Sequence, residues 1–189
     1  MSKIHVKSER VVNAKPEAVY DVLSDYQWKR PRILTPNFLD YNVERGGRGA
    51  GTIVNYRLQA ARRERPYRMT VEEPVKGSVI SERDTNSSLQ TVWTLLPVQD
   101  GRQTRVSLVT EWEGSRGVGG FFERTFAPLG LRRIYNNMLS LLEPQVQAQG
   151  DDDVVSGRGH GPVYLPVVLA IFGLVVVFAF VVGKVLRKK

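Results

Sequence analysis

The chain has 189 residues, a formal net charge of +8 and no cysteine. This length suits one folded domain of ordinary size with further segments. The lack of cysteine excludes disulfides, thiol nucleophiles and thiolate metal sites, and the positive charge favours anionic lipid surfaces or nucleic acid over acidic proteins.

Alternating apolar residues predict a first strand that begins at Ile4 and ends near Asn13. A helix is predicted to begin at Pro16, because proline suits the first turn of a helix and Glu17 favours its positive end. Polar residues from Ser24 onward end this helix, and a second short helix is expected soon after it.

The pattern changes to strands between Phe38 and Glu113. Turn-forming residues interrupt it at intervals suited to hairpins, and apolar side chains occupy every second position between them. This alternation is typical of an antiparallel meander with one covered face. The predicted covered face includes Val54, Tyr56, Leu58, Tyr67, Met69, Val71, Trp93, Leu95, Val106, Leu108, Thr110 and Trp112.

A long amphipathic helix is predicted over residues 117–147, where apolar side chains recur three and four positions apart. We expect this helix to cover the meander. Pro128 and Gly130 lie inside it, so we also expect a kink or a break into two helices near Ala127. Its apolar stripe contains Phe122, Phe126, Leu129, Leu131, Ile134, Tyr135, Met138, Leu141 and Leu142.

The C-terminal part of the chain predicts a membrane anchor. Residues 163–182 carry no charge, and a helix of 20 residues spans the roughly 30 Å core of a bilayer. The preceding polar, glycine-rich segment offers too little apolar surface to fold alone. The expected organisation is a folded domain (1–147), a flexible linker (148–161), a transmembrane helix (162–183) and a basic tail (184–189).

Two topology rules disagree for this anchor. The N-terminus lacks the apolar run of a secretory signal, which leaves the domain in the cytosol, whereas the basic tail favours a cytosolic C-terminus. We expect a single-pass membrane protein with a cytosolic domain, because passing a short tail across a membrane is easier than passing a domain of this size.

The order of these elements resembles the START-like (SRPBCC) superfamily, specifically its polyketide cyclase/dehydrase and lipid-transport branch. The similarity covers roughly residues 3–147 and is carried by the segments KPEAVYDVLSDYQW (15–28), Gly51-Thr52 and VSLVTEWEG (106–114). It implies an α+β helix-grip fold, in which a curved antiparallel sheet wraps around the long C-terminal helix. It also implies an elongated apolar cavity that binds lipids, isoprenoids, quinones or polyketides.

The predicted function is therefore membrane-tethered binding, presentation or transfer of a hydrophobic small molecule. The alternative is that the side chains on the covered face of the meander pack against those of the long helix and leave no cavity. The candidate cavity residues are Tyr56, Leu58, Tyr67, Met69, Val71, Trp93, Leu95, Val106, Leu108, Thr110, Trp112, Phe122, Phe126, Tyr135 and Met138.

No hydrolase, metalloprotease or phosphate-binding motif accompanies the two histidines, His5 and His160, so no metal, cofactor or catalytic residue is expected. An enzyme of the aromatase/cyclase kind is the first alternative. It would need a polar group in the cavity to move a proton, for which Tyr56, Tyr67 and Tyr135 are candidates by position. The second alternative is a ligand-free module that binds undetermined protein partners.

Basic residues at one predicted hairpin tip, Arg62, Arg63 and Arg65, form the candidate membrane-surface contact. Each such charge contributes about 1 kcal/mol near an anionic bilayer. Further basic residues lie in this hairpin and in the early loop: Arg57, Arg68, Lys29, Arg30 and Arg32. The alternative is a solvated charged loop, and nucleic acid is not an expected partner because no aromatic stacking motif is interleaved with these charges.

Overall fold

The computed structural model describes residues 3–60, 63–114 and 118–156, with the side chains of 3–60, 63–114 and 127–148. The chain divides into two compact units, Met1–Asp151 and Asp152–Lys189. The predicted domain 1–147 lies within the first unit, and the predicted anchor lies outside the described residues. In the described ranges, no helix is long and apolar enough to cross a bilayer.

Seven strands and three helices make up the described structure. The strands are β1 (Lys3–Val12), β2 (Phe38–Arg45), β3 (Ile53–Ala60), β4 (Arg63–Val75), β5 (Val79–Asp84), β6 (Gln90–Val98) and β7 (Gln103–Glu113). The helices are α1 (Pro16–Ser24), the short 3-10 helix η1 (Arg30–Ile33) and α2 (Val118–Ser156).

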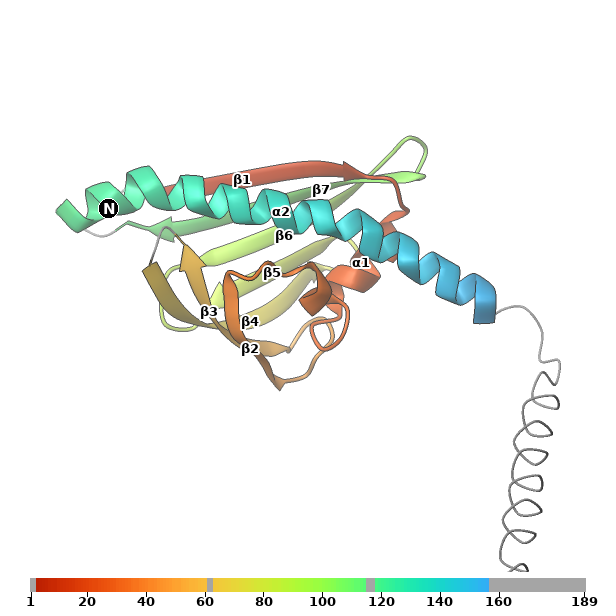
Figure 1. Ribbon diagram of the computed structural model, residues 1–189, viewed down its shortest axis with the longest axis horizontal. Helices are drawn as coiled ribbons and strands as arrows, with labels where there is room; N and C mark the ends of the chain where they lie inside the picture. The colour runs from red at the N-terminus through yellow and green to blue at the C-terminus, as the bar shows by residue number, and fades with distance from the viewer. Residues whose placement is uncertain (1–2, 61–62, 115–117, 157–189) are drawn as a thin grey trace, which may run out of the picture. The chain divides into compact units, whose positions relative to one another are not determined.

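All strands join one antiparallel sheet in the order β1-β7-β6-β5-β4-β3-β2. The predicted meander from Phe38 to Glu113 is confirmed as β2 to β7, and β1 pairs with β7 at its end. α2 lies along one face of this sheet (Figure 1). The strand side chains predicted to face inward are buried or half-buried, as the alternating burial of β7 illustrates. In the predicted apolar stripe of the long helix, Leu129 and Leu141 are instead exposed, because they lie on the side of α2 that faces away from the buried cluster. The architecture is that of the expected helix-grip fold.

The end of α1 is fixed by the glycine-rich loop between β2 and β3. The backbone N–H groups of Tyr26 and Gln27 both donate to the carbonyl of Gly47, at 2.8 and 3.1 Å. Gly49 donates to the carbonyl of Ser24 and has a φ of +62°, a conformation that favours glycine. This loop therefore sets the direction in which the chain leaves α1 toward η1.

One end of the sheet's inner face is filled by α1 and by the later turns of α2. Val19, Val22 and Leu23 of α1 belong to the same buried cluster as Leu139 and Leu142 of α2, and α1 contacts β6 and β7. This end of the interior is a packed core.

α2 differs from the prediction in two respects. It continues through Pro128 and Gly130, so the expected break into two helices near Ala127 is wrong, while the alternative of a kink stays a prediction. A proline removes one backbone hydrogen bond, and the packing of the following turns against the sheet outweighs that loss. The helix also runs to Ser156, so the first part of the segment 148–161 that we expected to be a linker is helical.

Candidate ligand cavity

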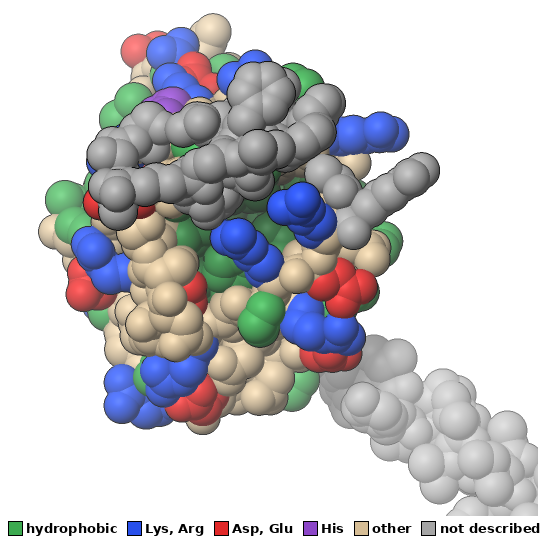
Figure 2. Space-filling view, turned by 90° about the vertical axis from the view of Figure 1, so that its left-hand side faces the viewer, with side chains coloured by type: hydrophobic (Ala, Val, Ile, Leu, Met, Phe, Trp, Pro, Cys, Tyr) green, Lys and Arg blue, Asp and Glu red, His purple; other side chains and the backbone are tan. Residues whose placement is uncertain are grey.

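The other end of the inner face encloses a cavity of about 660 Å³. Figure 2 shows it as a hollow with hydrophobic side chains inside and Lys or Arg side chains at its edge. The walls come from the strands β2 to β7, from η1 with the residue after it, and from α2. The described side chains of α2 on the cavity wall are Ala127, Leu131, Tyr135 and Met138.

Part of the predicted set lines this cavity: Tyr56, Leu58, Tyr67, Trp93, Trp112, Tyr135 and Met138. Another part does not line it and is buried in the packed core: Met69, Val71, Leu95, Val106, Leu108 and Thr110. Those residues point to the predicted side of the sheet, but neighbouring side chains cover them there. The side chains of Phe122 and Phe126 lie outside the described residues. Ligand contact by any of these residues stays a prediction.

A buried ion pair lies at the inner end of the cavity. The Arg30 guanidinium donates to the Glu82 carboxylate at 2.6 Å and to the Leu23 carbonyl at 3.0 Å. Tyr26 donates its hydroxyl hydrogen bond to the same carboxylate oxygen at 2.7 Å. All three side chains of this polar floor, Tyr26, Arg30 and Glu82, line the cavity and are less than 10% exposed.

Trp93 packs on the ion pair. Its ring lies 4.2 Å from the Arg30 guanidinium carbon, within the range of a cation–π contact. Its indole Nε1 is buried and has no hydrogen-bond partner among the described residues. Because neighbouring atoms cover this nitrogen, the N–H group does not face the open space of the cavity, and Trp93 contributes its ring to the wall.

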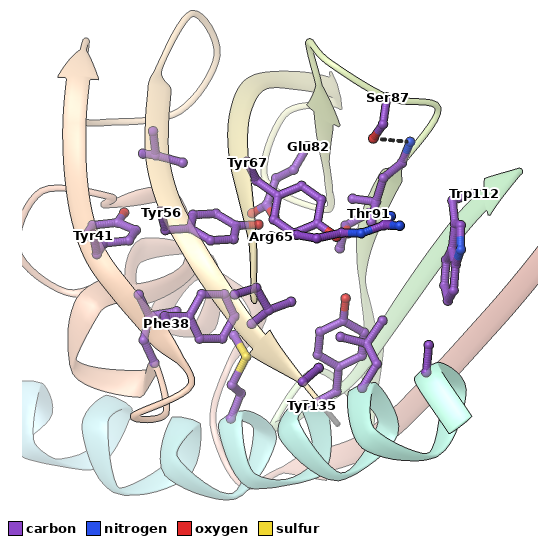
Figure 3. A pocket seen from close by; sticks show the side chains of 18 of the residues that line it. Phe38, Tyr41, Tyr56, Arg65, Tyr67, Glu82, Ser87, Thr91, Trp112 and Tyr135 are labelled. Carbon is purple, nitrogen blue, oxygen red and sulfur yellow. Dashed lines mark hydrogen bonds between the residues drawn. The ribbon is translucent and has the colours of Figure 1, made fainter. Parts of the chain in front are cut away.

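Tyrosine hydroxyls line the cavity above the floor. Tyr41 donates to the carbonyl of Tyr26 at 2.8 Å. The Tyr135 hydroxyl lies 2.6 Å from the Thr110 hydroxyl, which lies 2.8 Å from that of Thr91. Figure 3 shows Tyr56, Tyr67 and Tyr135 directed into the same space from different elements. The cavity thus combines aromatic walls with a few polar groups, as small-molecule sites do.

Burial keeps these tyrosines neutral. Loss of solvent raises the pKa of Tyr26 well above its usual value, and the nearby Glu82 carboxylate raises it further. Burial also raises the pKa of Tyr56 and Tyr135. Burial lowers the pKa of Arg30, but the combined attraction of Glu82 and the nearby tyrosine oxygens raises it above its usual value, so the guanidinium stays charged. The floor therefore combines one ionic pair with neutral phenols.

The structure shows where most of the predicted basic residues lie, and membrane-surface contact by Arg62, Arg63 and Arg65 stays a prediction. Arg63 and Arg65 line the cavity, whereas Arg62 lies outside the described residues. Arg30, which we grouped with surface-facing basic residues, is buried. Arg57 and Arg68 face away from the cavity and form ion pairs with carboxylates on the outer surface.

Sequence reasoning missed Tyr26 and Glu82 as site residues. A signal was present for Glu82, because it shares its strand parity with the buried Ile80 and so predicts a charge on the covered face. A buried carboxylate needs a cation, but the sequence does not say which one reaches it. Among the described residues, no group of three or more His, Asp or Glu is placed to hold a metal ion.

The family model for polyketide cyclase/dehydrase and lipid transport matches residues 3–147. The chain belongs to this family. Its match spans all seven strands, both preceding helices and most of α2. No curated protein has a significantly similar sequence.

Among solved structures, the polyketide cyclase/dehydrase domain is similar to the KanY protein, whose solution structure is 43% identical with a TM-score of 0.69. The similarity covers 78% of this chain and 99% of KanY. Because nearly the whole of KanY corresponds to this domain and is folded in solution, we treat residues 1–156 as able to fold alone.

Two more distant structures share the fold. A START superfamily protein from Mycobacterium smegmatis is 13% identical, with a TM-score of 0.59 over 77% of this chain and 98% of that one. The Zhui aromatase/cyclase from Streptomyces sp. R1128 is 16% identical, with a TM-score of 0.55 over 84% and 99%. These similarities support the fold and carry no assignment of activity.

Proposed function

We propose that the domain binds a hydrophobic small molecule in this cavity and presents or transfers it. The observation that carries the proposal is the cavity itself. Its volume of about 660 Å³ falls within the range of small-molecule sites, and its walls combine aromatic and aliphatic side chains with charged and hydroxyl groups. A ligand-free interaction module has no need of such a space, because a packed interior would be more stable.

The polar floor favours a ligand that carries an oxygen atom at its inner end. Tyr26, Arg30 and Glu82 line the cavity there. A carbonyl or hydroxyl oxygen can exchange hydrogen bonds with these groups, whereas an alkane cannot. The floor therefore favours an oxygenated lipid, isoprenoid or polyketide-like molecule over a plain hydrocarbon.

Mass spectrometry of organic extracts tests ligand binding. Residues 1–156 are purified from cells, extracted and compared with the Ala127→Trp variant, whose indole would occupy part of the cavity next to Leu131. We expect one class of hydrophobic compound that is enriched with the native sequence and lost from the variant. Equal extracts from both proteins would contradict the proposal.

We also propose that residues 163–182 tether the domain to a membrane and that the domain is cytosolic. The uncharged run of these residues supports the tether, because a helix of this length spans the core of a bilayer. A tether raises the concentration of a carrier at the membrane where its ligand resides. Alkaline extraction of membranes should leave the full chain in the pellet, and protease added outside intact cells should leave the domain whole. Release of the chain by alkali would contradict the tether, and digestion of the domain by external protease would contradict the cytosolic orientation.

A second candidate function is catalysis of the aromatase/cyclase kind. It is favoured by the Glu82 carboxylate and the Tyr26 hydroxyl, which face the cavity and are joined by a hydrogen bond of 2.7 Å. A carboxylate within reach of a bound substrate can act as a general base. Turnover of a polyketide-like substrate, lost in Tyr26→Phe with binding retained, would support an enzyme. Binding without turnover would support the carrier.

A further inference from the structure

The Glu82 carboxylate uses only one of its two oxygen atoms within the described structure. Its Oε1 atom accepts from the Tyr26 hydroxyl at 2.7 Å and from the Arg30 guanidinium at 2.6 Å. Its Oε2 atom has no hydrogen-bond partner among the described residues, and neighbouring atoms do not enclose it as they enclose the Trp93 nitrogen. Because each carboxylate oxygen offers two lone pairs, Oε2 is an acceptor with unused capacity.

The carboxylate of Glu82 is reached through the cavity. Glu82 lies on β5, shares its strand parity with the buried Ile80 and lines the cavity, although the residue is only 8% exposed. Figure 3 shows its side chain directed into the space that Tyr56 and Tyr67 border. The unused oxygen is therefore open to a molecule in the cavity and not to the outer face of the sheet.

Neighbouring polar side chains leave Oε2 without a donor. Thr91 lies opposite Glu82 in the register of β5 and β6, but the Thr91 hydroxyl lies 2.8 Å from that of Thr110. Burial raises the pKa of Tyr56 and the charge of Glu82 raises it further, yet no hydrogen bond joins these two side chains in the part of the chain that the structure describes. A donor for Oε2 therefore comes from solvent or from a molecule that displaces solvent from the cavity.

The buried ion pair limits the charge of that molecule. Arg30 already neutralises Glu82, so a cationic donor would be buried beside a like charge on Arg30, and an anion beside a like charge on Glu82. A molecule with no donor would displace solvent from a charged oxygen and leave this oxygen unsatisfied. An uncharged donor avoids all three costs, and a hydroxyl group is such a donor.

We propose that the cavity selects a hydrophobic alcohol or phenol whose hydroxyl group donates a hydrogen bond to Oε2 of Glu82. This inference rests on the proposed function and specifies its ligand class. Hydrogen bonds to a charged acceptor are stronger than neutral ones, and a buried site that makes one rejects an analogue without the donor. The rest of the molecule gains free energy from contact with apolar wall residues such as Leu34, Phe38 and Leu58.

Two isomeric probes test this proposal. Decan-1-ol and 1-methoxynonane have the same atoms and differ in whether the oxygen carries a hydrogen. Each is titrated against residues 1–156 by isothermal titration calorimetry. Transfer from water into an apolar site favours the ether, so a preference for the alcohol indicates a hydrogen bond that the alcohol donates to the protein. We expect the alcohol to bind about tenfold more tightly than the ether.

A variant without the carboxylate should lose this preference. Arg30→Met combined with Glu82→Leu removes the acceptor and leaves no unpaired charge in the interior, and it should bind the ether at least as tightly as the alcohol. The matched control is Glu44→Gln, which removes a carboxylate that binds Arg68 at 2.6 Å on the outer surface of the same sheet. This control should keep the preference for the alcohol.

The comparison of the two isomers with the native sequence needs no variant to decide the inference. Equal binding of both, tighter binding of the ether or binding of neither would overturn it. A preference for the alcohol that survives in Arg30→Met with Glu82→Leu would also overturn it, because the donor would then bind elsewhere.

The organic extract separates this inference from the proposed function. A compound enriched with the native sequence should gain an acetyl group from acetic anhydride, which acylates hydroxyl groups. An enriched compound that carries no hydroxyl group would contradict the inference and leave the proposed function intact. Equal extracts from the native sequence and Ala127→Trp would contradict the proposed function and the inference with it.

Discussion

The two ends of the sheet's inner face have the same alternating sequence pattern, but one end is packed and the other encloses a cavity. At one end, Leu95 of β6 and Val106 of β7 face inward in the same buried cluster as the side chains of α1, which contacts both strands. At the other end, Leu58 and Tyr67 face inward from neighbouring strands and line a cavity. Alternation thus decides which side chains face inward, and the covering elements decide whether the space is filled.

The cavity end also contains the ion pair of Arg30 with Glu82, the only Arg–Glu pair among the described residues in which both side chains are buried. The largest effect on stability is predicted for this pair. Glu82→Gln removes the negative charge and leaves the Arg30 guanidinium buried with an uncompensated charge. We expect a loss of about 3–5 kcal/mol in the free energy of unfolding. Urea denaturation of residues 1–156 measures it.

The control for this prediction replaces both partners. Arg30→Met combined with Glu82→Leu removes the pair together with its desolvation cost, so its stability should exceed that of Glu82→Gln. If Glu82→Gln loses less than about 1 kcal/mol, solvent reaches the pair and the floor is not the buried site described above.

A pair of truncations compares the two ends directly. Leu23→Ala in the packed end should lose about 3 kcal/mol of unfolding free energy, because the side chain is fully buried and its removal leaves a void. Leu58→Ala in the cavity wall should lose less than about 1 kcal/mol, because this side chain already borders open space. Urea denaturation of both variants checks the contrast, and similar losses would show that the cavity collapses in solution.

The smallest predicted effect for a single side chain is the loss of stability that each buried tyrosine causes at alkaline pH. The pKa of Tyr26, Tyr56 and Tyr135 is raised in the fold, first of all by burial, above the value of about 10 expected in the unfolded chain. Their contribution to stability is therefore complete below pH 10 and declines as the pH rises above it. Each tyrosine contributes a slope of up to about 1.4 kcal/mol per pH unit.

Thermal unfolding between about pH 8 and pH 11 measures this decline. The variant Tyr56→Phe should show a shallower fall than the native sequence, because one group no longer ionises on unfolding. An unchanged slope would mean that Tyr56 ionises equally in the folded and unfolded chain, and hence that solvent fills the cavity around it.

Local patterns were sufficient to predict most of the fold. Hydrophobic alternation, the turn residues between strands and the proline at the start of α1 predicted the seven strands and the first helix. The break near Ala127 was predicted wrongly, because the cost of Pro128 is local whereas the packing that offsets it involves Leu131 and Ile134 against the sheet.

The site was less predictable than the fold. The residues that face inward were identified by parity, yet only those beyond the reach of α1 line the cavity. Arg30 and Glu82 lie 52 positions apart, and no local pattern pairs a loop arginine with a strand carboxylate at that separation. Arg63 and Arg65 were interpreted from the sequence as a charged hairpin tip. Their spacing of four and two residues from Tyr67 already placed them on the same face of the strand as Tyr67.

The sequence by itself determined the order of the elements, the face each strand turns inward and the resemblance to a family whose model matches residues 3–147. These properties depend on neighbouring residues and on a period of two or 3.6 positions. Only the tertiary structure decided that a cavity remains, that Arg30 and Glu82 close its floor and that Arg63 and Arg65 line its outer end. Those properties depend on contacts between segments distant in the chain, where the volume of one element limits the space left by another.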